Sequence, residues 1–334
     1  MKCLITGVTG MVGSHLVDYL LDETEWEITG LSRWRSDMSN LRHRVAEMNS
    51  RARLTIEYGD ITDFSSLSRV VELTQADVIF HLAAQSYPQT SFTGPSGTLE
   101  TNIIGTCNLL ESVRKFSPSS IVHVCSSSEV FGRVPRELVP ISEECRFHPA
   151  SPYAISKAGT DLLGVFYAEA YGLKTLTTRM FTHTGPRRGD VFAESSFAKQ
   201  IARIELGLQE PVVKVGNLKS TRTIADVRDA VNAYYLLVTR VSTWGAVFNI
   251  GGEKSMSVGE ILETLISMST YEGIDVEVDP ERLRPIDADL QIPDTRKFRS
   301  ATGWAPSISF EQTMEDLLDY WRLKLRSDGD VVQR

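Results

Sequence analysis

A tyrosine and a lysine four residues apart can do acid–base chemistry together. Tyr153 and Lys157 stand in the stretch Tyr-Ala-Ile-Ser-Lys. Residues four apart on a helix share one face, so we expect the ammonium to lie beside the phenol. A neighbouring cation favours the phenolate and lowers the pKa of a tyrosine. Tyr153 is therefore predicted to take a proton from a substrate hydroxyl while a hydride leaves the same carbon.

Hydroxyls and a carboxylate follow an apolar run upstream of this pair. The run ends at Cys125, and the residues after it read Ser-Ser-Ser-Glu. If the run is a strand of a parallel sheet, its carboxyl end opens into the ligand crevice. Ser127 is then placed to donate a hydrogen bond to the oxygen that becomes a carbonyl. Glu129 is placed to act as a second acid or base.

A glycine-rich turn follows the first apolar run and precedes a helical pattern. It reads Gly-Val-Thr-Gly-Met-Val-Gly over residues 7–13. Glycine lets backbone approach a pyrophosphate closely, and a helix N-terminus offers free N–H groups to it. The spacing GxxGxxG differs from the better-known GxGxxG fingerprint. The residues predicted to hold a dinucleotide here are Gly7, Thr9, Gly10, Met11, Val12 and Gly13.

The second apolar run ends in a basic loop. An Asp or Glu there would hydrogen-bond the ribose 2′-hydroxyl and favour NAD. This loop reads Ser-Arg-Trp-Arg-Ser over residues 32–36, and Arg33 and Arg35 can pair with a 2′-phosphate. The predicted cofactor is therefore NADP. Asp60 and Ile61, after the third run, are expected at the adenine, although an ordinary turn role for Asp60 is equally open.

Strand patterns alternate with helical patterns over the first 180 residues. This alternation predicts an α/β fold with a Rossmann-like, doubly wound parallel sheet. The predicted strands are 2–6, 27–31, 54–58, 78–82, 121–126 and 175–180, with a later one at 247–250. The predicted helices are 12–21, 65–73, 101–114, 258–268 and 310–325, with Ser257 as the N-cap of the fourth.

We expect two parts in the chain. Residues 1–180, with a returning segment 223–247, are predicted to form the cofactor-binding domain. Residues 181–222 and 248–334 are predicted to form a smaller C-terminal α/β domain for the substrate. The change from a regular to an irregular pattern after residue 180 supports this division.

Bulk properties exclude several classes of function. The net charge of −8 argues against a broad nucleic-acid surface. The four cysteines lie far apart, so we predict buried free thiols and no structural metal site. No basic leader and no run of 18 apolar residues occurs in the chain, so we expect a cytoplasmic protein that does not insert into a membrane.

The order and spacing of these motifs resemble those of the extended short-chain dehydrogenases/reductases. Over nearly the whole chain they are most similar to the group that holds GDP-mannose 4,6-dehydratase and GDP-4-keto-6-deoxymannose reductase. The stretches that carry this resemblance are 81–86, 126–132, 151–154, 185–189 and 283–285.

The resemblance implies further site residues. Beside the glycine turn and the basic loop, it places at the cofactor Leu82, Ala83, Ala84, Tyr153, Lys157 and His183. At a GDP-sugar it places Gln85, Ser86, Ser127, Ser128, Glu129, Thr182, Lys199, Arg222 and Arg284. Thr182 departs from the pattern, because the family usually carries Asn before the histidine. The catalytic set implied is Ser127, Glu129, Tyr153 and Lys157.

The resemblance implies a lyase that converts a GDP-hexose such as GDP-mannose, or a GDP-heptose, to its 4-keto-6-deoxy product. Residues 85–89 and 187–189 look more like the dehydratase, whereas 197–201 and 215–218 look more like the reductase. A reductase, an epimerase and a non-catalytic cofactor sensor therefore remain as alternatives. The family also implies a homodimer or homotetramer, with the loop 33–42 reaching towards a neighbouring subunit.

Overall fold

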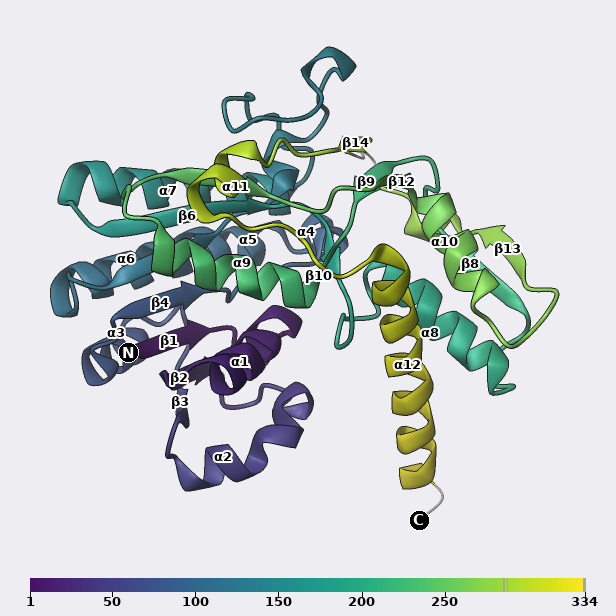
Figure 1. Ribbon diagram of the computed structural model, residues 1–334, viewed down its shortest axis with the longest axis horizontal. Coiled ribbons are helices and arrows are strands. Elements are labelled where there is room, and N and C mark those ends of the chain that lie inside the picture. The colour runs from purple at the N-terminus through teal and green to yellow at the C-terminus, as the bar shows by residue number, and fades with distance from the viewer. Residues whose placement is uncertain (285, 287, 333–334) are drawn as a thin grey trace.

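Seven parallel strands form the central sheet of the computed structural model, which describes residues 1–284, 286 and 288–332 (Figure 1). The order is β11-β6-β5-β4-β1-β2-β3, and it reverses between β1 and β4. A parallel sheet opens a ligand crevice where its order reverses. The strands are β1 (Lys2–Thr6), β2 (Glu27–Ser32), β3 (Leu54–Tyr58), β4 (Val78–His81), β5 (Ile121–Cys125), β6 (Lys174–Met180) and β11 (Val247–Ile250). The predicted doubly wound α/β fold is confirmed.

Helices cover both faces of this sheet, which explains why its strands read as continuous apolar runs. Side chains from two sets of helices pack in separate apolar clusters on the two faces. One face carries α1 (Met11–Glu23), α9 (Val227–Arg240) and α11 (Arg296–Thr302). The other carries α3 (Phe64–Thr74), α6 (Gly105–Phe116) and α7 (Pro152–Tyr171).

The start of α7 decides where the Tyr-Lys pair lies. The Ser151 hydroxyl accepts a hydrogen bond from Ala154 N at 3.0 Å, and Pro152 occupies the first helical position. Both features are typical of a helix N-terminus. They begin the helix one residue before Tyr153, at the carboxyl edge of the sheet. Lys157 follows one turn later on the same helix.

The predicted helix 101–114 begins differently from the expectation. Its first turn is a π-helix, η2 (Glu100–Ile104), which leads into α6. Asn102 lies buried in this turn, and its side chain accepts from Gln85 N at 2.8 Å and donates to Gln85 O at 3.0 Å. The turn thereby anchors the loop that follows β4. Between β4 and η2 lie α4 (Pro88–Thr93) and α5 (Pro95–Leu99).

A second part with its own apolar core lies beside the carboxyl edge of the sheet (Figure 1). Its core joins α8 (Ala193–Glu205), α10 (Val258–Ser267) and α12 (Phe310–Val332). The Ser257 hydroxyl and Glu260 form a capping box at the start of α10, as expected for the predicted N-cap. The short strands here are β7 (His183–Thr184), β8 (Val212–Val215), β9 (Thr221–Thr223), β10 (Ala225–Asp226), β12 (Ser255–Ser257), β13 (Asp275–Val278) and β14 (Leu290–Gln291).

Two segments placed in the second part by sequence pack on the first core instead. Strand β11 pairs with β6 along its whole length, beyond the expected limit at residue 247. Helix α11 covers β11, and the ring of Phe298 lies 5.7 Å from that of Phe248 and 5.7 Å from that of Trp304. The proposed segment 248–334 therefore returns once more to the sheet before α12.

The described residues contain no helix long and apolar enough to span a membrane. Within the same residues, no three His, Cys, Asp or Glu side chains gather as a metal site would need. All four cysteines are free thiols, and Cys3 is buried whereas the other three are partly exposed. The prediction of free thiols is confirmed, but full burial holds only for Cys3.

Replacing Phe298 should strongly destabilise the sheet part. Phe298 is fully buried between β11, α9 and Trp304. Phe298→Ala should lower the free energy of unfolding by about 3–5 kcal/mol, because it leaves a cavity in a packed core. Denaturant unfolding followed by circular dichroism measures this loss. Leu323→Ala, at a side chain that is 67% exposed on α12, should change stability little; equal losses in both variants would contradict this packing account.

Candidate functional site

One cavity of about 1220 Å³ runs along the carboxyl ends of the central strands and into the second part. It brings together nearly all residues predicted from the sequence. The predicted residues that line it are Gly7, Thr9, Gly10, Met11, Val12, Gly13, Arg33, Asp60, Ile61, Leu82, Ala83, Ala84, Gln85, Ser86, Ser127, Ser128, Glu129, Tyr153, Lys157, Thr182, His183, Arg222 and Arg284. Arg35 and Lys199 do not line it.

The glycine turn forms a cradle that larger residues would fill. A Cβ on Gly7, whose φ is +73°, would lie 2.7 Å from Ala83 N. A Cβ on Gly13 would lie 2.3 Å from Gly7 O. Helix α1 begins at Met11 and has no acidic residue in its first turn, so nothing opposes an anion at its free N–H groups. These features fit a dinucleotide pyrophosphate.

The basic loop presents one of its two arginines to the cavity. Arg33 lines the cavity together with Ser36 and Asn40, whereas Arg35 is exposed and points elsewhere. Asn40 Nδ2 donates to Thr9 O at 3.0 Å and so ties the loop to the glycine turn. Of the two predicted arginines, only Arg33 lines the cavity, because the chain turns between them, with Ser36 N donating to Arg33 O at 3.0 Å.

Asp60 has a turn role in addition to its place in the cavity wall. One of its carboxylate oxygens accepts from Thr62 N at 2.9 Å and from the Thr62 hydroxyl at 2.8 Å. These bonds form a local Asx turn, which explains the residue type without a ligand. Both readings left open by the sequence thus have support, since Asp60 and Ile61 also line the cavity.

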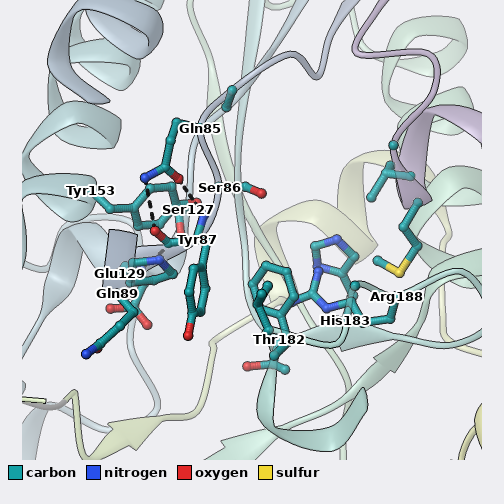
Figure 2. A pocket seen from close by; sticks show the side chains of 18 of the residues that line it. Gln85, Ser86, Tyr87, Gln89, Ser127, Glu129, Tyr153, Thr182, His183 and Arg188 are labelled. Atoms are coloured by element: carbon teal, nitrogen blue, oxygen red, sulfur yellow. Dashed lines mark hydrogen bonds between the residues drawn. The ribbon is translucent and has the colours of Figure 1, made fainter. Parts of the chain in front are cut away.

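The catalytic candidates meet at the ends of β5 and α7. The Ser127 hydroxyl accepts from Glu129 N at 3.2 Å and caps the short helix η3 (Ser128–Phe131). This cap places Glu129 on the same side of the pocket as Tyr153 (Figure 2). Lys157 Nζ donates to Cys125 O at 2.6 Å, so the ammonium is held against the end of β5.

The pKa of Tyr153 differs from the expectation. Burial raises it above its usual value, while a hydrogen bond with Ser127 and the charge of Arg188 act in the opposite direction. Burial also lowers the pKa of Lys157. In this site burial has the larger effect on the pKa of Tyr153, and the Lys157 ammonium is directed to the Cys125 carbonyl.

Gln85 is occupied by its own loop. Its side chain accepts from Tyr87 N at 2.6 Å and donates to Tyr87 O at 3.1 Å and to the Thr98 hydroxyl at 3.2 Å. These bonds hold the loop after β4 in the shape that presents Tyr87 to the pocket. The amide therefore shapes the pocket wall even though it was predicted as a direct sugar contact.

His183 and Thr182 lie across the pocket from Tyr153 (Figure 2). His183 Nδ1 bonds Phe181 O at 3.1 Å, and burial lowers the pKa of His183 to about 4. The ring is therefore neutral at physiological pH, with Nδ1–H donating to the carbonyl. Such a bond sets the ring orientation and leaves Nε2 as an acceptor.

Three basic residues predicted at the substrate have different surroundings. Lys199 Nζ pairs with Asp190 at 2.6 Å and lies 5.2 Å from the Trp321 ring, outside the cavity wall. Arg222 lines the cavity and donates to the Ala288 carbonyl. Arg284 Nη1 lies 3.8 Å from Glu129 Oε1. Pro285, part of the same motif, lies outside the described residues.

Several lining residues were missed as site residues from sequence. The rings of Tyr87 and Phe192 pack edge to face at 5.8 Å, and the Arg188 guanidinium lies 3.4 Å above the Phe192 ring. Figure 2 shows Tyr87 between the Tyr153 side and the His183 side of the pocket. No sequence pattern marks Tyr87, Arg188 and Phe192 as site residues, because their contacts join segments about 100 residues apart. The only signal was the resemblance at 187–189.

Comparisons with known proteins identify relatives along nearly the whole chain. A family model described as GDP-mannose 4,6 dehydratase matches residues 4–317. GDP-mannose 4,6 dehydratase 1 of Arabidopsis thaliana is 33% identical, over 95% of this chain and 88% of its own. GDP-6-deoxy-D-mannose reductase of Pseudomonas aeruginosa is 30% identical, over 98% and 99%.

Solved structures show the same likeness. RMD of Pseudomonas aeruginosa, in complex with NADPH, superposes with a TM-score of 0.82 at 29% identity and covers 97% of this chain and 99% of its own. UDP-glucose 4-epimerase of Thermotoga maritima, with UDP-glucose, superposes with a TM-score of 0.85 at 28% identity, over 97% and 100%. The matched family model spans the glycine turn, the Ser127–Glu129 segment and the Tyr-Lys helix alike. The chain therefore belongs to the GDP-mannose 4,6-dehydratase family.

Proposed function

We propose that this chain is an NADP-dependent 4,6-dehydratase that converts a GDP-hexose such as GDP-mannose, or a related GDP-heptose, to its 4-keto-6-deoxy product. The observation that carries this proposal is the place of Glu129, whose carboxylate lines the same cavity as Tyr153 and Ser127. Elimination next to a ketone needs a base for the C5 proton, and a carboxylate beside the sugar supplies one.

Each catalytic residue acts at its own step of the proposed reaction. Tyr153 takes the proton of the C4 hydroxyl, and Ser127 donates a hydrogen bond to that oxygen as it becomes a carbonyl. Glu129 then takes the C5 proton and returns it to the departing C6 hydroxyl, which leaves as water. The glycine turn would hold NADP, which when bound would accept a hydride from C4 and return it to C6. Tyr153 then releases its proton to solvent, and solvent supplies the final proton to C5, so that both side chains regain their starting states.

The second part of the chain would hold the nucleotide diphosphate. Arg222 and Arg284 line the cavity on that side and offer guanidinium groups to phosphate. Lys199 is not included in this proposal, because it does not line the cavity and pairs with Asp190 at 2.6 Å. Thr182 and Ser86 remain proposed sugar contacts, as both line the pocket near Tyr87.

A reductase acting on a GDP-4-keto-6-deoxy-sugar is the second candidate. It is favoured by the likeness to the Pseudomonas aeruginosa reductase, which extends over nearly the full length of both chains. A reductase uses Tyr153 to protonate the new hydroxyl and needs no base at C5. Wild-type protein that consumes NADPH with a 4-keto-6-deoxy sugar, and yields no 4-keto-6-deoxy product from any GDP-sugar, would establish this alternative.

Glu129→Gln separates the two activities. The substitution keeps the size of the side chain but removes the base, so 6-deoxy product should form about 10²–10⁴-fold more slowly. Oxidation at C4 should survive, because Tyr153 remains. Mixing the variant with GDP-mannose and NADP should therefore build up enzyme-bound NADPH, seen as near-ultraviolet absorbance, while mass spectrometry finds little product.

Tyr153→Phe is the matched control for this experiment. It removes the acid–base oxygen and keeps the ring, so neither NADPH nor product should accumulate. Near-normal turnover in Tyr153→Phe would refute the assignment of Tyr153. Normal turnover in Glu129→Gln would refute the elimination role of Glu129.

Of the two loop arginines, we expect only Arg33 to contribute to a preference for NADP over NAD. Wild-type protein should bind NADP more tightly than NAD, as measured by calorimetry. Arg33→Ala should remove most of this preference, because a charge-assisted bond to phosphate contributes roughly 1.5–3 kcal/mol, or about 10–150-fold. Arg35→Ala is the control and should change little, since Arg35 does not line the cavity. A wild-type preference for NAD would contradict the proposal.

We also propose a homodimer or homotetramer that pairs through α7. Its exposed face carries Ile155, Leu162 and Phe166, which are 50–60% exposed, and Ile104 of η2 is 50% exposed nearby. Apolar stripes of this kind mark interfaces. Light scattering should give two or four times the chain mass of 37.2 kDa, and Leu162→Glu should shift it towards the monomer. A wild-type protein that is monomeric and fully active would contradict the proposed oligomer.

A further inference from the structure

Asp18, on the outer face of α1, binds side chains from two different loops. Its Oδ1 accepts from Arg44 Nε and from His43 Nε2, each at 2.7 Å. Its Oδ2 pairs with Arg187 Nη1 at 2.7 Å. The carboxylate is only 19% exposed, so three donors from distant segments meet on one partly buried group. No role in the proposed reaction explains this arrangement.

The first loop is the basic loop of the cofactor site. It leaves the end of β2, passes the cavity at Arg33 and Asn40, and ends in the 3₁₀ helix η1 (Ser39–Arg44). Asn40 fixes the middle of the loop to the glycine turn. His43 and Arg44 fix its far end to Asp18. The loop is therefore tied to the glycine turn at Asn40 and to Asp18 at its far end.

The second loop follows β7 and enters the cavity from the other side. Arg187 has a φ of +68°, a left-handed conformation that side chains other than glycine rarely adopt. Arg187 lines the edge of the cavity and reaches Asp18 with its guanidinium, whereas the next residue, Arg188, lies over the Phe192 ring in the cavity wall. The neutral His15 of α1 adds a second link, since its Nε2–H donates to Pro186 O at 3.0 Å.

The charge on Asp18 is maintained in this setting. Burial raises the pKa of its carboxyl, but the hydrogen bonds from Arg44 and His43 and the charge of Arg187 outweigh burial and hold the pKa below its usual value. The carboxylate is thus ionised at neutral pH. An isolated surface ion pair contributes little, but a charged network with short bonds around one partly buried group can hold loops together.

We propose that Asp18 is a positioning residue that ties the basic loop to the Arg187–Arg188 turn and thereby slows release of the cofactor. The inference rests on the proposed NADP site, and it deepens the proposed function. A dehydratase restores its cofactor in every cycle and gains from keeping it bound. A reductase must exchange its cofactor in every turnover, so a clamp of this kind would limit its rate.

The test measures release of NADPH without any turnover. Protein loaded with NADPH is mixed with a large excess of NADP, and the loss of bound NADPH fluorescence gives the release rate. Asp18→Asn should speed release about tenfold or more, while the thermal unfolding midpoint of the cofactor-free protein stays near that of the wild type. A release rate within twofold of the wild type would overturn the proposal.

Arg187→Gln is the second variant and carries the test if Asp18→Asn does not fold. It removes the other side of the same contact, so it should speed release to a similar extent. The double variant should add little to either single change, because both break one link. Fully multiplicative effects of the two changes would overturn the proposal, since they would show that the residues act separately.

Asp22→Asn is the matched control on the same helix. Asp22 lies one turn after Asp18, has a side chain that is 56% exposed, and pairs with Arg44 alone among the described residues, at 2.5 Å. Its loss leaves Arg187 tied to Asp18, so release should stay near the wild-type rate. Equal acceleration by Asp22→Asn would show that anchoring Arg44 alone matters, and would refute the link between loops. Failure of the dehydratase assay would leave these release rates, and the conclusion from them, unaffected.

Discussion

The close approach of backbone at the ends of β1 and β4 is the constraint on which the rest of this structure depends. Gly7 lies against Ala83, and Gly13 lies so close to Gly7 O that no side chain fits at either glycine. This contact lets α1 start directly at the crevice and point its free N–H groups into it. The same contact lies where the sheet order reverses, and its residues Gly7, Gly13 and Ala83 line the cavity.

A buried ion pair stabilises the catalytic side of the crevice. Arg179 donates twice to Asp161, at 2.9 and 3.0 Å, and once to Glu143 O at 2.6 Å. Asp161 lies one turn after Lys157 on α7, while the Arg179 guanidinium lies 4.6 Å from the Phe147 ring in the segment that follows Glu129. One buried ion pair thus fixes the helix with the tyrosine and the segment after the carboxylate against the same strand.

The sequence predicted the sheet and most of the cavity wall because both depend on local patterns. Strands buried on two faces read as apolar runs, and polar residues after such runs must lie at one edge. The directions of single side chains depend on distant partners and could not be predicted. Lys199 turns to Asp190, and Arg35 turns to solvent. The raised pKa of Tyr153 likewise follows from burial, which no spacing of residues reveals.

The late return of α11 to the first core has a consequence for how the chain is made. Phe298 and Trp304 complete a core whose other members begin at Cys3, so nearly the whole chain must leave the ribosome before that core closes. Until α11 has been synthesised, the face of β11 that it covers stays exposed, and Phe248 can contact non-native partners. The cofactor-binding part is therefore not an independent first-folding unit, and assembly of the nascent protein is a late, cooperative event.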